Sequence, residues 1–573
     1  MIRLPLGLIL FTLAGSLAAI PARAAAKRPN VLIVLTDDQG YGDFSGHGNA
    51  ILKTPHLDRL REASVRFTDF HSAPMCTPTR GQLMSGVDAV RNGATSVTGG
   101  RSFLRPEIPT MPEIFGAAGY RTGMFGKWHL GDNYPHRPMD RGFQEAVYHL
   151  GWGFTSAPEF ANTLIDGRYF RNGVEMRFSG HCTDLWFEQA MAWMRERGRR
   201  GEPFLCYLAT NAPHAPHTEL DEFVKPYEDH GAAGFYGMIA HIDRDMDGLM
   251  RFLGETGLRE NSILIFMTDN GGTAGVKFFN AGLRGNKTTY YEGGHRVPCW
   301  VSWPAGSLGR PRDIDEPAEM QDVLPTLLEL CGVRAPAGAG FDGTSLAGLL
   351  RGRSERLPDR MIVVQYSRAT LEKWQCAVIW NQWRLVNGKE LYDVHADRAQ
   401  ANDLASSRRE IAEKMRAHYE RWWNGLSEKV QNFVPAATIS RRGPLVALSS
   451  SDWQDVYVDN ARTVRAAAGG TRGAPWNINV ETEGEYEIAL RRWPREVDLP
   501  LGAGSGPESK AFPIAAAKVS VAGAEYSAKT SPEAKEVVLR LKLPAGRTRL
   551  QAWFQDSGGQ DLCGAFYAYV RPR

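Results

Sequence analysis

Two pairs of oxygen-bearing side chains, each directly after a run of apolar residues, could bind a metal ion. Asp37 and Asp38 follow one run, and Asp269 and Asn270 follow another. Three carboxylates and one amide oxygen suit a hard divalent cation, and they suit Ca²⁺ better than Zn²⁺. An isolated Asp-Asp pair is more often a solvated loop or a helix cap. Two such pairs after two separate apolar runs favour the metal site.

Basic side chains from other segments could surround an anion. They are Arg80, Lys127, His129, His214 and Lys287. Lys127 and His129 are two residues apart, so both can point the same way on an extended segment. A tetrahedral oxyanion needs several hydrogen-bond donors around its oxygens. Taken singly, each of these residues is more often a surface or hydrogen-bonded group, so the anion site is predicted from the set as a whole.

Residues 76–80 read Cys-Thr-Pro-Thr-Arg and place a cysteine four residues before Arg80. A free cysteine is usually a small buried apolar residue, and the short motif alone does not exclude that role for Cys76. The sequence has seven cysteines without regular spacing, which does not suggest a disulfide scaffold. An odd number leaves at least one thiol unpaired, and six remain if Cys76 is chemically changed.

Apolar runs and helical stretches alternate in the region that carries these residues. Four runs are predicted to be buried strands: Asn30–Thr36, 204–210, Ser262–Thr268 and 297–303. Helices are predicted over 54–63, 110–118 and 236–253. This alternation predicts an α/β domain over 27–355 with a large, mostly parallel sheet flanked by helices. Ligands gather at the carboxyl ends of such strands, where the polar pairs stand.

Two further units are predicted after the α/β domain. Residues 356–435 contain short antiparallel strands and a helix near 408–425, which indicates a smaller α+β subdomain. Residues 436–573 are rich in alternating patterns and turns, typical of an accessory β-sandwich. Its predicted strands are 453–458, 476–480, 484–490, 537–543, 549–554 and 565–570. Trp476, Trp493 and Trp553 could bind carbohydrate there, although a core position is the more common role of such residues.

The first 24 residues have the composition of a signal peptide. Arg3 precedes an apolar run over 4–20, and Ala22 and Ala24 offer a cleavage site. We therefore expect an exported protein, periplasmic or secreted, that is not an integral membrane protein. Lys and Arg number 67 against 64 Asp and Glu, and no dense basic run predicts a nucleic-acid partner. The oligomeric state is left open.

Six motifs together resemble those of formylglycine-dependent (type I) sulfatases, members of the alkaline-phosphatase-like superfamily. In chain order they are Asp37-Asp38, 76–80, Gly-Lys-Trp-His-Leu-Gly at 126–131, Ala-Pro-His at 212–214, Asp-Asn-Gly at 269–271 and Lys287. The resemblance covers about residues 28–430 and excludes the β-rich end. His56 stands where this family often has Asn, and Asn286 where Gly often precedes the lysine; neither change affects a catalytic position.

The resemblance implies a sulfatase with one Ca²⁺ in each active site. The implied metal ligands are Asp37, Asp38, Asp269, Asn270 and the modified residue 76. Cys76 is converted to Cα-formylglycine by a formylglycine-generating enzyme, for which Pro78 and Arg80 form part of the recognition sequence. A hydroxyl of the hydrated aldehyde then attacks the sulfur of a sulfate ester.

The resemblance also assigns roles to the basic residues. His214 and Lys287 hold the sulfate near the leaving oxygen, with His214 as the proton donor. His129 is the base that regenerates the aldehyde, and Arg80 and Lys127 hold the hydrate. Two other readings remain open at this point. One is a phosphonate or phosphate ester hydrolase of the same superfamily, and the other is a catalytically dead polysaccharide-binding protein.

The expected substrate is a sulfated carbohydrate, because an exported sulfatase carries an added β domain. Small aryl sulfates are expected to be hydrolysed as well. Candidate pocket residues are Trp152, His71, Arg91 and Arg101, which flank the motifs. A packing or surface role for these four is equally consistent with the sequence.

Overall fold

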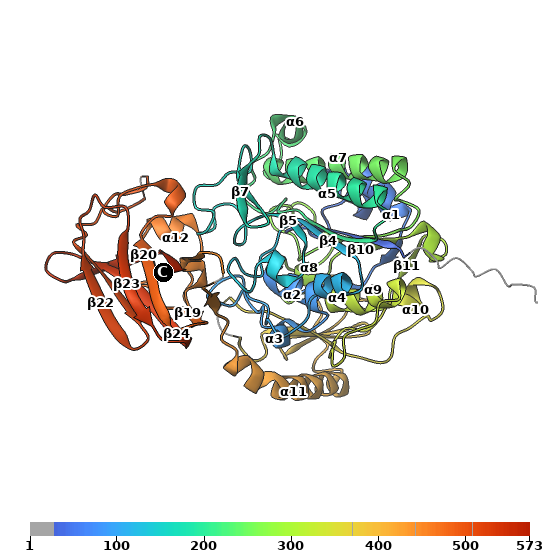
Figure 1. Ribbon diagram of the computed structural model, residues 1–573. Coiled ribbons are helices and arrows are strands. Elements are labelled where there is room, and N and C mark those ends of the chain that lie inside the picture. The colour runs from blue at the N-terminus through green and yellow to red at the C-terminus, as the bar shows by residue number, and fades with distance from the viewer. Residues whose placement is uncertain (1–27, 369–370, 442, 507) are drawn as a thin grey trace, which may run out of the picture.

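The centre of the molecule is a ten-stranded sheet (Figure 1). The computed structural model describes residues 28–368, 371–441, 443–506 and 508–573, so the predicted signal peptide lies outside it. In sheet order the strands are β11 (Arg312–Ile314), β2 (Val65–Phe67), β10 (Cys299–Ser302), β9 (Ser262–Thr268), β1 (Asn30–Thr36), β8 (Phe204–Ala209), β4 (Arg121–Lys127), β5 (Glu145–His149), β6 (Arg168–Arg171) and β7 (Val174–Arg177).

The middle of this sheet is parallel, as the alternation of strand and helix predicts. β9, β1, β8, β4 and β5 run in one direction. β10 runs antiparallel to both of its neighbours, and β6 and β7 form an antiparallel edge. β1 pairs with β9 so that Thr36 lies opposite Thr268. The residues that follow these two strands therefore emerge side by side, which brings Asp37 next to Asp269.

Helices cover both faces of the sheet (Figure 1). One face carries α1 (Pro55–Glu62), α5 (Cys182–Arg199) and α7 (Ala233–Glu255), and the other carries α2 (Cys76–Ser85), α4 (Met111–Ala117), α9 (Val323–Cys331) and α10 (Ala347–Leu350). Alternate residues of β1 point to opposite faces, so Leu32 and Val34 pack in one core while Ile33 and Leu35 pack in the other. Shorter helices are α3 (Ala89–Asn92), α6 (Asp221–Val224) and α8 (Glu292–His295).

A smaller unit follows the ten-stranded sheet. Its four antiparallel strands are β13 (Ile362–Gln365), β14 (Cys376–Trp380), β15 (Trp383–Val386) and β16 (Glu390–Asp393). α11 (Arg409–Asn432) packs its apolar face on this sheet through Ala412, Met415 and Tyr419. The helix extends further than the predicted end at residue 425.

The chain ends in a unit of two stacked sheets, here called the C-terminal β domain (residues 436–573). One sheet contains β17 (Ala437–Ile439), β19 (Trp476–Val480), β24 (Gly546–Gln555), β21 (Ala516–Val521), β22 (Ala524–Lys529) and β25 (Asp561–Gly564). The other contains β18 (Val446–Ser449), β26 (Tyr567–Pro572), β20 (Gly484–Arg491) and β23 (Val537–Leu543), and α12 (Ala461–Arg465) lies beside them. This arrangement confirms the predicted class of a large α/β unit, an α+β subdomain and an appended β-sandwich.

The structure decides two expectations for the C-terminal β domain. Trp476, Trp493 and Trp553 are at most 1% exposed, which confirms the more common core role and removes the carbohydrate-binding alternative. Residues 453–458 form no strand. Trp453 and Val458 pack into the core, which produces the alternation with polar residues. The backbone between them forms hydrogen bonds with residues that belong to no strand, such as Gly99.

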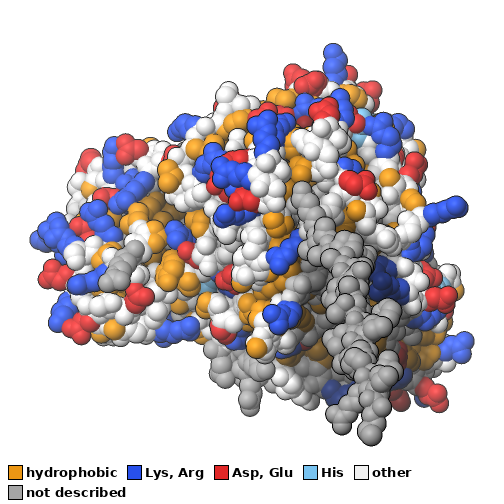
Figure 2. Space-filling model, turned by 45° about the vertical axis from the view of Figure 1, so that its right-hand side comes forward, with side chains coloured by type: hydrophobic (Ala, Val, Ile, Leu, Met, Phe, Trp, Pro, Cys, Tyr) orange, Lys and Arg blue, Asp and Glu red, His pale blue; other side chains and the backbone are white. Residues whose placement is uncertain are grey.

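The charges on the surface and the apolar character of the helices relate to the predicted lack of nucleic-acid and membrane partners. On the face drawn in Figure 2, basic and acidic side chains are interspersed over both ends of the molecule. Within the described part of the chain, none of the helices combines the length and the apolar character needed to cross a membrane.

Candidate active site

The carboxyl edge of the parallel strands gathers the predicted site residues. Asp37 and Asp38 follow β1, Lys127 ends β4, and Asp269 follows β9. Cys76 is the first residue of α2, which begins against this edge. None of these five side chains is more than 5% exposed. The fold therefore buries a group of carboxylates, an amine and a thiol at the sheet edge where ligands of α/β proteins bind.

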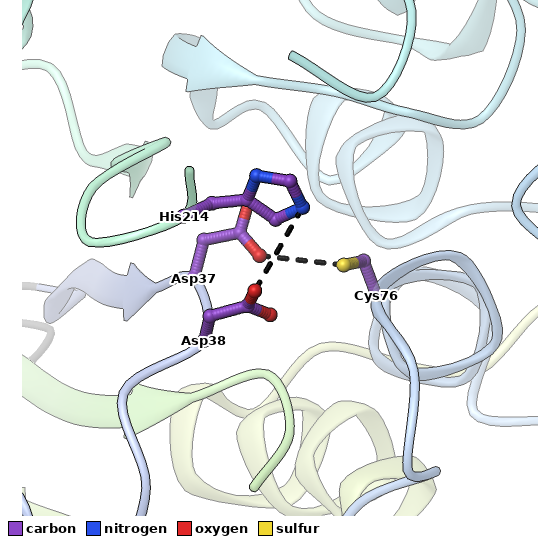
Figure 3. Close-up of side chains that lie close together, drawn as sticks. All are labelled: Asp37, Asp38, Cys76 and His214. Atoms are coloured by element: carbon purple, nitrogen blue, oxygen red, sulfur yellow. Dashed lines mark hydrogen bonds and ion pairs between the residues drawn. The ribbon is translucent and has the colours of Figure 1, made fainter. Parts of the chain in front are cut away.

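The Cys76 thiol lies between a carboxylate and an ammonium group. Its Sγ donates to Asp37 Oδ1 over 3.3 Å, and the Lys287 ammonium donates to Sγ over 3.4 Å (Figure 3 shows the first contact). Burial, and next the charge of Asp37, raise the pKa of the thiol above its ordinary value. The unmodified side chain is thus a neutral thiol, which is a poor nucleophile.

The carboxylates and Asn270 form an oxygen-rich group suited to a cation. Asn270 Nδ2 donates to Asp38 Oδ1 over 2.8 Å, while the buried Asn270 Oδ1 has no hydrogen-bond partner in the structure. Burial, and next the charge of Asp37, raise the pKa of Asp269 to about 6. A divalent cation would bind the free amide oxygen together with the neighbouring carboxylate oxygens. The residues present therefore fit a hard metal ion.

Three cationic side chains balance the three carboxylates. Arg80 donates to Asp269 Oδ2 over 2.8 Å and to the backbone carbonyl of Lys127 over 3.0 Å. The Lys127 ammonium pairs with Asp37 Oδ2, and Lys287 Nζ lies 2.5 Å from Asp38 Oδ1. Burial disfavours the charged form of Lys287, but the charges of Asp38 and its other acidic neighbours together outweigh burial and hold the pKa of Lys287 well above its ordinary value. The site is therefore electrically balanced without a substrate.

His214 faces the same group from the loop after β8. Its Nε2 lies 3.7 Å from Asp38 Oδ2, and its Nδ1–H donates to the carbonyl of Ala215 over 2.7 Å (Figure 3 shows the first contact). Burial lowers the pKa of His214 to about 3; the charge of Asp38 opposes this shift and that of Lys287 adds to it. Trp152 lies against the imidazole, with ring centroids 5.3 Å apart. Of the candidate pocket residues, Trp152 is thus in contact with the site.

The backbone at His129 is not extended, unlike the segment predicted to carry both Lys127 and His129. Its φ of 56° is left-handed, so the chain turns sharply two residues after Lys127. Its Nε2 lies 3.1 Å from the carbonyl of Val97, while the buried Nδ1 has no partner in the structure. Burial, and next the charge of Lys127, lower the pKa of His129 well below its ordinary value. The ring is therefore a neutral imidazole with one free ring nitrogen.

Comparison with known proteins identifies the family. A family model described as Sulfatase matches residues 29–333, more than half of the chain. The chain belongs to the sulfatase family.

Named relatives of this sulfatase agree with that result. Arylsulfatase A from Homo sapiens is 32% identical over 371 residues, covering 59% of this chain and 70% of the relative. N-acetylgalactosamine-6-sulfatase from Canis lupus familiaris is 28% identical over 402 residues, covering 64% and 76%. The crystal structure of Ps i-CgsB has 26% sequence identity and a TM-score of 0.62, covering 69% of this chain and 92% of its own. The chain is therefore a sulfuric ester hydrolase.

A more distant structure shares the fold. The structure of BT4656 in complex with its substrate D-glucosamine-2-N,6-O-disulfate is 17% identical, with a TM-score of 0.59, covering 70% of this chain and 99% of its own.

Three of the four candidate pocket residues of the sulfatase contact other groups. His71 is fully buried, 3.0 Å from Asp69 and 3.0 Å from His295. Arg91 pairs with Asp342, and Arg101 pairs with Asp455. These contacts give the three residues packing roles, which the sequence left as an equal alternative.

Two residues that the sequence did not single out also lie near the site. Tyr207 on β8 accepts a hydrogen bond from Arg80 Nη1 over 3.3 Å. His149 ends β5 beside Lys127, and its buried Nε2 has no partner in the structure. Burial lowers the pKa of His149 to about 3, and Lys127 and Arg80 add to this shift. A strand-end position was the available signal for His149, but β5 is too short to be recognised from its sequence.

Proposed function

We propose that this sulfatase acts through Cα-formylglycine formed at Cys76. The position of Cys76 supports this: it lies between Asp37 and Lys287, yet its buried neutral thiol is poorly suited to attack. A hydrated aldehyde at this position supplies a hydroxyl nucleophile that no encoded side chain supplies. All ten residues of α2 are buried, so a formylglycine-generating enzyme must act before the chain folds.

We infer a calcium site formed by Asp37, Asp38, Asp269, Asn270 and residue 76. The free buried oxygen of Asn270 and the raised pKa of Asp269 support it. A bound Ca²⁺ supplies a Lewis acid that polarises sulfate oxygens. With residue 76 as hydrated formylglycine, every proposed ligand binds through oxygen, which favours calcium over zinc.

The basic residues have three further roles in the proposed reaction. Arg80 and Lys127 offset negative charge at residue 76, because both already reach its acidic neighbours. Lys287 and His214 lie on the Asp38 side and hold the sulfate, with His214 donating a proton to the leaving oxygen. The anionic ester favours the protonated imidazole there. His129 Nδ1 accepts the proton that is lost when the aldehyde is regenerated.

The natural substrate that we propose is a sulfated carbohydrate. Its support comes first from the relatives, which include an N-acetylgalactosamine-6-sulfatase, and from BT4656 with its bound disulfated glucosamine. Aromatic surface at the site adds to it. Trp152 is partly exposed beside His214, and Tyr457 of the C-terminal β domain is 56% exposed. Tyr457 is two residues before Asp459, whose carbonyl accepts a hydrogen bond from Trp152 Nε1 over 3.1 Å, so the phenol belongs to a segment that contacts Trp152.

Two measurements test this proposal. The peptide that contains residue 76, from protein made in its native host, should be about 18 Da lighter than its cysteine form. An unmodified thiol in active protein contradicts the mechanism. Trp152→Ala should lower kcat/KM for D-glucosamine-2-N,6-O-disulfate about tenfold while 4-nitrophenyl sulfate is affected much less, because a small aryl ester has no sugar ring to pack against the indole. Equal losses on both substrates contradict the sugar-binding role of Trp152.

We also propose export to the periplasm or the medium, on the composition of residues 1–24. The N-terminal residue of the mature protein tests this, because cleavage near Ala24 is expected.

A further inference from the structure

A tight turn of the catalytic domain is built against the C-terminal β domain. Residues 98–101 read Thr-Gly-Gly-Arg. Gly99 and Gly100 have φ of 68° and 69°, and the Arg101 amide donates to the Thr98 carbonyl over 3.3 Å. Two successive left-handed residues make such a turn costly for any pair other than glycines. A Cβ at Gly100 would lie 3.2 Å from the backbone oxygen of Asp452, so the β domain also limits the space there.

Five residues of the two domains join across this turn. The Gly99 amide donates to the Ser451 carbonyl over 3.1 Å, and the Asp455 amide donates to the Gly99 carbonyl over 3.1 Å. Thr98 Oγ1 donates to the same Ser451 carbonyl over 3.1 Å. Arg101 Nε and Nη2 both donate to Asp455 Oδ1, over 2.9 and 2.7 Å. The conformation of the turn therefore depends on the β domain.

The residue directly before the turn holds the catalytic imidazole. The Val97 carbonyl can only accept, so His129 Nε2 carries the proton that it donates to Val97. In a neutral ring the lone pair then resides on Nδ1, the atom to which the proposed function assigns the proton transfer. A displaced Val97 carbonyl would free the ring to rotate or to change tautomer, and either change removes the base from its position.

We propose that Asp455 and Ser451 of the C-terminal β domain are positioning residues for His129, acting through the 98–101 turn and the Val97 carbonyl. This inference rests on the proposed role of His129 as a base. It gives the β domain a function in catalysis, although no residue of that domain is assigned a chemical step.

Other contacts fix the β domain independently of this turn. Ala157 and Phe160 of the catalytic domain pack in the core of the β domain. Arg168 Nη2 lies 2.9 Å from Glu496, and Trp152 Nε1 donates to the Asp459 carbonyl over 3.1 Å. Removing the Asp455 carboxylate should therefore loosen the turn without undocking the domain.

The test uses 4-nitrophenyl sulfate, whose hydrolysis does not depend on the natural substrate. The variants are Asp455→Ala, Thr98→Val and the two combined, with Glu496→Ala as the control that removes an interdomain ion pair away from the turn. The combined variant is expected to lower kcat about tenfold with KM little changed, since a small misplacement of a catalytic group is costly. Glu496→Ala should keep the wild-type kcat. The charge swap Arg101→Asp with Asp455→Arg should recover part of the loss.

A double-mutant cycle with His129→Ala decides whether the effect passes through His129. If it does, Asp455→Ala adds no further loss in the His129→Ala background, because the group it positions is already gone. Losses that multiply, or an Asp455→Ala variant with wild-type kcat, overturn the inference. If His129→Ala itself keeps full activity, the proposed role of His129 fails, and the inference fails with it.

Discussion

The carboxyl edge of the ten-stranded sheet and the interior of the C-terminal β domain are both closed to solvent, but they are filled in opposite ways. At the edge, Asp37, Arg80 and Lys127 are completely buried. In the β domain the corresponding space holds Trp476 and Trp493, which are also completely buried. One region therefore confines charge and the other confines large apolar rings.

The two regions differ in what burial contributes. Moving apolar rings out of water lowers the free energy of the folded state, so the β domain is stabilised by its own core. Buried charges lose hydration, and even paired ones often contribute little to stability. A protein that keeps three carboxylates beside three cations, of which Arg80 and Lys127 are completely buried, thus keeps them for chemistry. Changes at the edge should remove activity, and changes in the β core should remove stability.

The largest expected effect is on activity at the edge. Cys76→Ala should lower kcat for 4-nitrophenyl sulfate on the order of 10⁴-fold or more, as loss of a nucleophile does in other hydrolases. The matched control is Cys206→Ala, which removes an equally buried thiol from β8, away from the charged group. This variant should keep its kcat per folded molecule. Equal losses in both variants would mean that Cys76 is a packing residue.

Removal of the metal should be the next largest effect. Chelation of calcium should lower kcat about 10²- to 10³-fold, because a Lewis acid contributes several kcal/mol to such reactions. It should also lower the melting temperature, since the ion binds only the folded site. Added Ca²⁺ should restore both quantities. An Asp38→Asn variant should respond weakly to chelator and to calcium. Full activity of the wild type after exhaustive chelation would contradict a calcium site.

The opposite behaviour is expected in the β domain. Trp553→Ala should lower the free energy of unfolding by about 3–5 kcal/mol, the usual cost of removing a large buried ring. Denaturant titration followed by tryptophan fluorescence measures it. The kcat for 4-nitrophenyl sulfate should stay unchanged under native conditions. Val538→Ala, at a position that is 40% exposed on β23, serves as the control with little effect. A large loss of kcat in Trp553→Ala would contradict the claim that changes in the β core affect stability and leave activity unchanged.

The same contrast explains what the sequence could predict. β1 and β9 are continuous apolar runs buried on both faces, and both were predicted to the residue. Because these strands are neighbours, the predicted carboxylates of Asp37 and Asp269 do converge. β4 was missed, since its sequence Arg-Thr-Gly-Met-Phe-Gly-Lys has no apolar run. Gly126 within it allows a close approach to β8, where a Cβ would lie 1.8 Å from the Ala209 oxygen.

Local backbone geometry at the site was beyond a sequence pattern. Asp38 and His129 both have left-handed φ, at 66° and 56°, which only the surrounding tertiary contacts can enforce. Residues 453–458 show the converse error. Apolar and polar residues alternate in this segment because some contact the β core and others contact the 98–101 turn. The resulting pattern is the one expected of a strand. Interactions between domains are thus the least visible in the sequence.

The smallest expected effect lies where the two regions meet. Burial, and next the charge of Asp132, raise the pKa of Asp452 to about 8. A carboxyl with a raised pKa stabilises the fold fully below its unfolded pKa, and this contribution is lost as pH rises through about 8. Asp452→Asn should therefore leave the melting temperature unchanged at pH 5 and raise it by about 2 °C at pH 8.5. Glu533→Gln, an exposed change in the same domain, should show no such pH dependence. A melting temperature lowered at pH 8.5 would mean that the Asp452 carboxylate is favourably paired, and that charge is stabilising on the β-domain side of the boundary as well.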